Sequence, residues 1–409
     1  MRIGVYFTAS QNSGGVYQYS VTLLKVLSKI KENKYVIFTT SPDIPSEIKK
    51  LRSVKVIDLA TDSQEKLLNY RDRLSNLQHK FFPNFFHLVY NLGLFSLLTP
   101  INKLINREAI QKIESEDLDL VFYPTTSNLS FLAKTPAVVT IHDLHHRKTP
   151  EFLETSAGGR WEFREYTYKN IFKMAKIVLA ESEFGKKDII KYYRFDPERI
   201  IVLKMLPPSY LNPRVGKRVS NKLKKRFEIS DKYLFYPAKF WPHKNHIRII
   251  KALARLKRVN ITPDLVLSGS KNADFGTFEA VMSLSEKLKV KKQIKYVGYV
   301  SNEEMSALYK NSLALIMPTF FGPSNIPLLE AWKIGTPAIY TNIEGCSHEL
   351  GDAGLPVNPK SITDIASKIK MIYKDDTLRR TLSRKGKKRI SERTEKEFSK
   401  TIKEVVLKY

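Results

Sequence analysis

The chain has 409 residues, of which 42% are hydrophobic and 27% are charged. This length and composition predict two or three domains with a buried core, and they exclude a disordered chain, a fibrous protein and a small disulfide-stapled module. Lys and Arg number 69 against 41 Asp and Glu, a net charge of +28. Such an excess favours a polyanionic partner, either nucleic acid, an anionic lipid surface or a phosphorylated substrate. The single cysteine, Cys346, allows no internal disulfide, which favours a reducing, cytoplasmic location.

Short runs rich in β-branched and aromatic residues alternate with helical patterns through the first half of the chain. The predicted strands are residues 3–7, 35–39, 54–57, 120–123, 137–141, 177–180 and 200–203, and the clearest helical patterns are 17–30 and 184–193. The first run is too short for the apolar region of a signal peptide, so we expect a buried strand there. The alternation predicts a parallel sheet with helices on both faces.

The alternation breaks at residues 204–227, which contain three prolines, and then restarts. The later predicted strands are residues 233–236, 265–267, 294–297, 313–317 and 338–340. We therefore predict an α/β protein of two facing Rossmann-like domains. Residues 1–206 form the first, 207–228 a linker, 229–390 the second, and 391–409 a C-terminal helix that packs back toward the first. Parallel sheets bind ligands beyond the carboxyl ends of their strands, so the predicted active site is a cleft between the domains.

Two segments bear on membrane contact. Residues 81–98, FFPNFFHLVYNLGLFSLL, are apolar and aromatic but are interrupted by proline and polar residues, whereas a spanning helix needs about 20 mostly apolar residues. An ordinary core helix and a membrane-surface segment both remain open, and nearby Lys80, Lys103 and Arg107 support the second. Residues 379–389, RRTLSRKGKKR, hold seven basic residues and no acid, which is either a solvated helix face or a further attraction to an anionic bilayer. Together they predict peripheral attachment to the inner face of the plasma membrane.

Glycines and a histidine follow two predicted strands in the first half. Gly14 and Gly15 come between the first strand and a helix, where they allow close backbone approach and a helix N-terminus that favours phosphate, unless they form a plain turn. The spacing is not the dinucleotide-binding G-x-G-x-x-G pattern. His142 comes directly after the fifth strand and is expected to point into the cleft and bind a polar ligand. His145 and His146 are expected to be solvated or to lie behind it, because their loop spacing does not complete a metal site.

Two loops of the second half combine charge with strand ends. Lys239 and Lys244 follow the strand at 233–236 beside aromatic residues and prolines, so they are either surface charges or contacts to a diphosphate. Glu330 lies near the start of a helix that follows a Gly/Pro loop after the strand at 313–317. It is either a favourable charge at the helix N-terminus or an acceptor for ribose hydroxyls, with backbone amides of the loop left for phosphate.

The sequence resembles the family-four retaining glycosyltransferases of the GT-B fold over nearly its whole length. The resemblance rests on Gly14-Gly15, His142-Asp143, 182–184, the Lys239/Lys244 loop, 297–299, 326–331 and 335–337, in that order. It implies a nucleotide-sugar substrate of unknown base, no other cofactor, and an acceptor held by the first domain. By position it assigns the ribose to Glu330, the diphosphate to Lys239 and Lys244, the base to Gly298 and Tyr299, and the donor sugar to His142.

The loop before Glu330 departs from the family pattern. Relatives commonly have two glutamates with seven residues between them, but the first position here is Gly322, followed by Pro323-Ser324-Asn325 and Ile326. We interpret this as a sub-branch variant, with Ser324, Asn325 and Ile326 in donor binding and Asn325 as a replacement for the missing glutamate. The implied activity is metal-independent transfer of a hexose, with retention, to a glycan or lipid-linked hydroxyl in polysaccharide or lipopolysaccharide assembly.

Two other functions stay open. A nucleotide-sugar epimerase or hydrolase would use the same architecture and would release free sugar or epimer without an acceptor. A basic nucleic-acid-binding protein would belong to a different class, but no known nucleic-acid module is recognisable and Lys and Arg are spread over both halves. An Asp-x-Asp motif, Asp117 to Asp119, precedes a predicted strand at the end opposite the cleft, so we expect no metal there.

Overall fold

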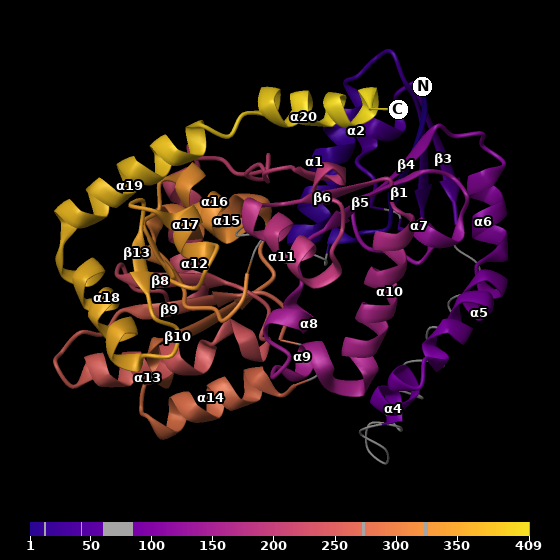
Figure 1. The fold of residues 1–409 in the computed structure, drawn as a ribbon. Coiled ribbons are helices and arrows are strands. Elements are labelled where there is room, and N and C mark those ends of the chain that lie inside the picture. Colours follow the sequence, from indigo (N-terminus) through magenta and orange to yellow (C-terminus); the bar gives the residue numbers. More distant parts are fainter. Residues whose placement is uncertain (12–13, 42, 60–84, 272–274, 323–325, 409) are drawn as a thin grey trace. The chain divides into compact units, whose positions relative to one another are not determined.

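The computed structural model describes residues 1–11, 14–41, 43–59, 85–271, 275–322 and 326–408. They form two compact units, Met1–Leu206 with Thr394–Tyr409, and Pro207–Arg393. Each unit is built on one all-parallel sheet (Figure 1). These two Rossmann-like sheets confirm the predicted fold class. Residues 207–228, predicted as a linker, belong to the second unit and contain helix α12 (Lys217–Phe227).

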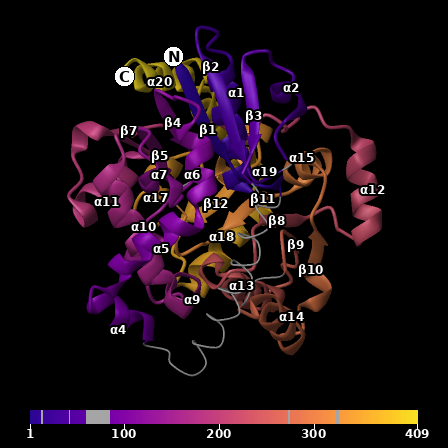
Figure 2. The same ribbon diagram turned by 90° about the vertical axis from the view of Figure 1, so that its right-hand side faces the viewer.

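The sheet of unit 1 has seven strands in the order β3-β2-β1-β4-β5-β6-β7. Their bounds are β1 Arg2–Phe7, β2 Lys34–Thr39, β3 Val54–Asp58, β4 Leu120–Tyr123, β5 Ala137–Ile141, β6 Ile177–Ala180 and β7 Ile200–Val202. The order reverses between β1 and β4, with Ile3 paired to Leu120, and Figure 2 shows β1, β2 and β3 side by side. Strands β4, β5 and β6 are buried along their whole length, because helices cover both faces of a parallel sheet.

The helices of unit 1 begin and end as follows. The α-helices are α1 Gly15–Ser28, α2 Ser46–Lys49, α4 Phe85–Asn91, α5 Leu98–Ile105, α6 Arg107–Glu114, α7 Leu129–Leu132, α8 His145–Lys148, α9 Leu153–Ser156, α10 Arg160–Met174, α11 Glu183–Tyr193 and α20 Glu395–Leu407. The short 3-10 helices are η2 Leu94–Leu97, η3 Ala157–Gly159 and η4 Pro197–Arg199. Helix α20 packs against α1, where Lys29 and Glu395 form an ion pair, so the chain returns to unit 1 at its last helix (Figure 1).

The sheet of unit 2 has six strands in the order β10-β9-β8-β11-β12-β13. Their bounds are β8 Tyr233–Pro237, β9 Asp264–Ser268, β10 Ile294–Gly298, β11 Ala314–Met317, β12 Ala338–Thr341 and β13 Leu355–Val357. The helices besides α12 are α13 His246–Lys257, α14 Thr277–Lys287, α15 Asn302–Asn311, α16 Ile326–Ile334, α17 Cys346–Leu350, α18 Ile362–Lys374, α19 Asp376–Ser391, η5 Pro242–Lys244 and η6 Lys291–Gln293. Side-chain caps start several of them: Ser301 and Glu304 form a capping box on α15.

The apolar segment at 81–98 is only partly described, because residues 81–84 lie outside the described ranges. Its remainder forms α4 and η2 and continues into α5, and no helix among the described residues is long and apolar enough to cross a bilayer. Phe95 is buried, but Leu88, Leu92, Leu94 and Leu97 are 44–63% exposed. Phe86, Val89 and Tyr90 pack against the core of unit 1, so the described part of this segment is partly core and partly exposed.

Candidate functional site

His142 lies at the carboxyl end of β5, as the strand pattern predicted, and both of its ring nitrogens have protein partners. Nδ1 lies 2.6 Å from a carboxylate oxygen of Glu181, and Nε2 lies 2.8 Å from the carbonyl oxygen of Pro124. A carbonyl and a carboxylate both accept hydrogen bonds, so His142 donates with both nitrogens and carries a positive charge. Burial by itself would lower the pKa of His142. The Glu181 carboxylate raises this pKa, and the net shift is upward.

A cavity of about 560 Å³ lies beside His142 in unit 1. Its lining comes from the carboxyl ends of β1, β4 and β5, from the start of α1 and from α10: Thr8, Ala9, Val16, Thr125, Thr126, His142, Asp143, Phe163, Arg164, Thr167 and Tyr168. Threonine hydroxyls beside an aromatic ring suit a ligand with many hydroxyl groups. Asp143 forms an ion pair with Arg164 and accepts a hydrogen bond from the backbone N–H of His145, 2.9 Å away. Burial raises the pKa of Asp143, but Arg164 lowers it more, so this carboxylate is ionised.

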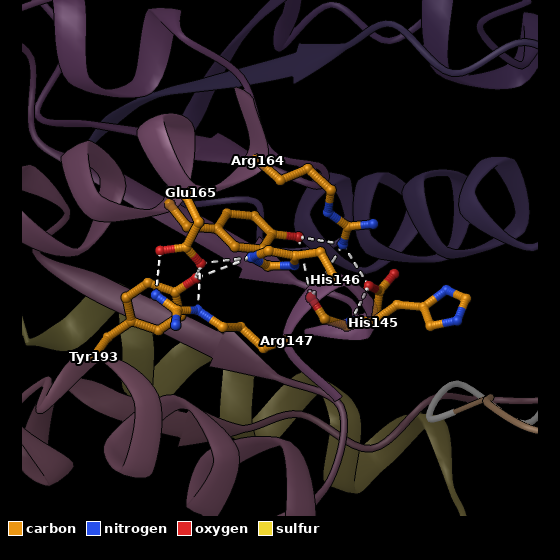
Figure 3. Close-up of polar contacts among 8 residues, drawn as sticks. His145, His146, Arg147, Arg164, Glu165 and Tyr193 are labelled. Carbon is orange, nitrogen blue, oxygen red and sulfur yellow. Dashed lines mark hydrogen bonds and ion pairs between the residues drawn. The ribbon is translucent and has the colours of Figure 1, made fainter. Parts of the chain in front are cut away.

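A buried polar cluster centred on Glu165 lies next to these cavity residues (Figure 3). One oxygen of Glu165 accepts from His146 Nε2 at 2.8 Å, from Arg147 Nε at 2.5 Å and from the Tyr193 hydroxyl at 2.6 Å, and the other oxygen pairs with Arg147. Both Glu165 and the His146 side chain are completely buried, and His145 is only 4% exposed. Burial excludes the solvated alternative for His145 and His146 and leaves the other, a position behind His142. His146 helps to hold α8 against α10.

The loops that follow β8 and β11 are joined to each other in unit 2. The carbonyl oxygen of His243 accepts hydrogen bonds from the Phe320 backbone N–H at 2.8 Å and from the Thr319 hydroxyl at 3.1 Å, and the Asn245 side chain donates to the carbonyl of Pro318 at 2.7 Å. Because β8 and β11 are neighbouring parallel strands, Lys239, Lys244 and the loop before α16 lie at one edge of the sheet. Both lysines are half-buried. Arg248, which the sequence reasoning missed, lies 5.1 Å from the Phe320 ring and adds a third cation.

Glycines at the ends of β9 and β10 complete this edge. A Cβ on Gly269 would lie 2.7 Å from the Ala238 carbonyl oxygen, so the loop after β9 approaches the start of the lysine loop closely. Gly298 has a φ of +66° and accepts a hydrogen bond from the Ser268 hydroxyl at 2.8 Å. Tyr299, the next residue, is 59% exposed. The side chain of Ile326 is buried at the start of α16, so only its backbone is available to a ligand.

Glu330 is buried on α16, and two tyrosines occupy its carboxylate. The Tyr210 hydroxyl donates to one oxygen and the Tyr309 hydroxyl to the other, each at 2.6 Å. Burial raises the pKa of Glu330, partly offset by these two hydrogen bonds. A ribose that binds Glu330 must share these oxygens with Tyr210 or displace it. Neither tyrosine was singled out from the sequence, because the contacts join residues far apart in the chain.

Three other predicted positions, Ser324, Asn325 and Gly14, have different outcomes. Ser324 and Asn325 lie outside the described residues, so the replacement of the missing glutamate stays a prediction. Gly14 has a φ of +63° and precedes α1, and no atom lies within 4 Å of a Cβ built on it. The space around Gly14 is therefore open, directly before the first turn of α1, which begins at Gly15. Among the described residues no group of three His, Cys, Asp or Glu side chains is placed to hold a metal ion.

The link between Glu181 and His142 gives a testable prediction. Replacing Glu181 with glutamine removes the charge that keeps His142 protonated, so the pKa of His142 should fall and the imidazole should be neutral at neutral pH. The measurement is the NMR titration of the His142 ring, with the 60%-exposed His87 as internal reference. Glu183→Gln, an exposed change two residues away, should leave the titration of His142 as it is. A midpoint that stays or rises in Glu181→Gln would show that Glu181 does not set the charge.

Two parallel Rossmann-like sheets, with cationic and glycine-rich loops at one sheet edge of the second unit, define an α/β protein built of two Rossmann-like units. Two protein-family models match the chain. The family described as "Glycosyltransferase Family 4" matches residues 13–204, and the family described as "Glycosyl transferases group 1" matches residues 219–389. The chain belongs to the family-four glycosyltransferases of the GT-B fold.

Known proteins resemble the chain in sequence and in structure. It is 26% identical to the O-antigen chain mannosyltransferase B of Escherichia coli over 61% of this chain and 64% of the relative. It is 28% identical to the O-antigen chain mannosyltransferase RfbU of Salmonella typhimurium over 57% of this chain and 60% of the relative. These matches span less than two thirds of either relative. Anabaena HepE, crystallised with UDP-glucose, has a similar fold, with a TM-score of 0.68, 14% identity and complete coverage of both chains.

Proposed function

We propose that the protein transfers a hexose from a nucleotide-diphosphate sugar to a hydroxyl group of a glycan or lipid-linked acceptor, in the assembly of a cell-surface polysaccharide or lipopolysaccharide. Its family membership and its likeness to O-antigen mannosyltransferases support this activity. The observation that carries the proposal is one edge of the sheet in unit 2. Lys239 and Lys244 lie on the loop after β8, which is hydrogen-bonded to the loop after β11, and Glu330 lies on α16, the next helix along the chain. The HepE complex with UDP-glucose supports the class of donor.

The proposed roles follow from charge. Cleaving the bond between sugar and phosphate develops positive charge on the sugar and negative charge on the leaving diphosphate. Lys239, Lys244 and backbone amides at the start of α16 would stabilise that diphosphate more in the transition state than in the ground state. We propose retention, with the acceptor hydroxyl attacking on the face that the diphosphate leaves and the leaving phosphate taking the proton, and with no metal ion.

The acceptor is proposed to bind in unit 1. The cavity beside His142 is large enough for a sugar, and its threonine hydroxyls offer hydrogen bonds to one. The doubly donating state of His142 means that its ring nitrogens are not available to a sugar hydroxyl. We therefore propose that His142 contacts the donor sugar through its ring carbon atoms.

A panel of UDP, GDP, ADP and their sugars tests the proposed function. A ligand that binds only the folded protein raises its melting temperature by mass action. One nucleotide diphosphate should raise the melting temperature in a concentration-dependent way, and the matching sugar nucleotide should then be consumed only with an acceptor present. Release of free sugar or an epimer without acceptor would favour the epimerase or hydrolase instead. If no nucleotide diphosphate changes the melting temperature, the proposal is wrong.

We also propose that unit 1 contacts an anionic membrane surface through α4, η2 and α5. Six apolar side chains on these elements and on the turn between α4 and η2 are 44–73% exposed: Leu88, Leu92, Leu94, Leu97, Ile101 and Leu104. Helix α5 buries none of its residues, and residues 85–107 include no acid but include Lys103 and Arg107. An exposed apolar row with basic neighbours is typical of a helix that lies at a bilayer interface.

Replacing Leu92, Leu97 and Leu104 with serine should weaken binding to phosphatidylglycerol vesicles at least about tenfold at low salt, because each leucine contributes burial in the interface. Sedimentation with vesicles measures the binding. These leucines are exposed, so circular dichroism should show an unchanged fold. A control with serine at Leu153, Val259 and Leu407, which are equally exposed elsewhere, should bind like the unaltered protein. Equal binding by both variants would rule out this surface.

A further inference from the structure

A second cavity, of about 490 Å³, lies in unit 2 at the opposite edge of its sheet from the lysine loops. Leu313 and Pro337 line it, and each directly precedes a strand, β11 and β12, so the cavity lies at the amino ends of these strands. The other lining residues are Ser312, Gly335 and, from α19, Arg379, Arg380, Ser383, Arg384 and Lys387. The cavity is thus separate from the proposed donor site.

Helix α19 is fixed in place by close packing. A Cβ on Gly386 would lie 2.3 Å from the ring of Trp332, so only glycine allows α19 to approach α16 this closely. Leu382 is also buried. On the cavity side, the Lys387 stem crosses Gly335 so closely that a Cβ there would lie 2.3 Å from Lys387 Cε. The position of α19 and of the Lys387 stem relative to the floor of the cavity is therefore set by the fold.

Of the four basic side chains that line this cavity, Arg379 pairs with Asp376, whereas the other three form no ion pair with a described residue. Lys385, on another face of α19, pairs with Asp352 at 3.0 Å, and Arg389 donates to the His348 carbonyl at 2.8 Å. By contrast, no acidic residue lines the cavity, and within the described residues Arg384 and Lys387 form no ion pair. Arg380, Arg384 and Lys387 are spaced four and three residues apart, where like charges on a helix repel each other. This arrangement of like charges destabilises the helix and attracts an anion.

We infer that this cavity binds a phosphate group. Arginine guanidinium groups offer paired N–H donors to phosphate oxygens, a lysine adds a compact charge, and the hydroxyls of Ser312 and Ser383 are further donors. The headgroup of an anionic phospholipid and a soluble phosphorylated molecule share this chemistry. The inference does not depend on glycosyl transfer, because none of the residues belongs to the proposed donor or acceptor sites.

The test measures the rate at which acetic anhydride labels Lys387, read by mass spectrometry for each lysine. Three probes are compared: inorganic phosphate, vesicles of phosphatidylcholine, and phosphatidylcholine vesicles that contain phosphatidic acid. We expect phosphate or the phosphatidic acid vesicles to slow labelling of Lys387 at least fivefold relative to the exposed Lys388 on the same helix. Protection by phosphate identifies a soluble source, and protection only by phosphatidic acid vesicles identifies a headgroup.

Paired variants separate this site from general electrostatic attraction. Arg380→Gln with Arg384→Gln should abolish the protection of Lys387, and both side chains are exposed, so the fold should be retained. Lys396→Gln with Lys403→Gln on α20 removes the same charge elsewhere and should leave the protection intact. Equal labelling of Lys387 with all probes, or undiminished protection in the arginine variant, would overturn the inference.

Discussion

Replacing Lys244 with alanine is expected to lower kcat by about two to three orders of magnitude while the fold is retained, because loss of one group that stabilises transition-state charge typically costs that much. Lys244 ends η5, and the Tyr236 hydroxyl donates to its backbone carbonyl at 2.6 Å. That contact holds the backbone of the loop and does not need the lysine side chain. The measurement is the transfer rate with saturating donor and acceptor, beside the melting temperature.

Two further variants show whether the effect belongs to the diphosphate. Lys239→Arg should keep most activity, because the positive charge is retained. Lys251→Ala, an exposed change on α13, should leave kcat unchanged. If Lys244→Ala turned over as fast as the unaltered enzyme, the assignment of Lys244 to the diphosphate would be wrong.

Replacing Glu165 with alanine should cost about 3–5 kcal/mol of stability, the usual loss when one partner of a buried ion pair is removed. The change removes the hydrogen-bond acceptor of His146, Arg147 and Tyr193 and leaves the Arg147 guanidinium without its carboxylate. Denaturant unfolding measures the loss. Lys291→Ala, which breaks an exposed pair with Glu286, is the control and should change stability little. A small loss in Glu165→Ala would show that the cluster is not coupled to folding.

The same residue predicts an acid dependence. Burial raises the pKa of Glu165, but His146, Arg147 and Tyr193 lower it more, to about 2. A carboxylate whose pKa is lower in the folded protein contributes stability above its unfolded pKa and loses it as the pH falls toward the folded value. The stability difference between the unaltered protein and Glu165→Ala should therefore be full above about pH 5 and shrink from there toward pH 2. A difference that does not change with pH would contradict this mechanism.

The apolar runs predicted most of the two sheets, because buried parallel strands are short, continuous and β-branched. Strands β4, β5 and β6 have the bounds predicted from the sequence. The edge strand β13 was missed, because its three residues include Pro356 and give no apolar run. Helix α12 was also missed inside the predicted linker, because its basic sequence buries only Ser220 and Leu223.

Positions in the site could be predicted where they follow a strand, and not where they depend on distant contacts. His142, Lys239 and Lys244 were singled out because they come after predicted strands, and the structure places them after β5 and β8. Glu181 follows β6 and could have been found by the same rule. Tyr210 could not, because its contact with Glu330 joins residues 120 positions apart and no local pattern marks it.

Helix α20 completes unit 1 although all of unit 2 precedes it in the sequence. It contributes four buried side chains, Phe398, Ile402, Val405 and Val406, to the hydrophobic interior of unit 1. During translation, the first 206 residues therefore leave the ribosome without the surface that later covers α1. Unit 2 can finish folding before α20 is available to unit 1. Until then, the face of α1 that α20 covers is exposed on the nascent chain, where a chaperone can bind it.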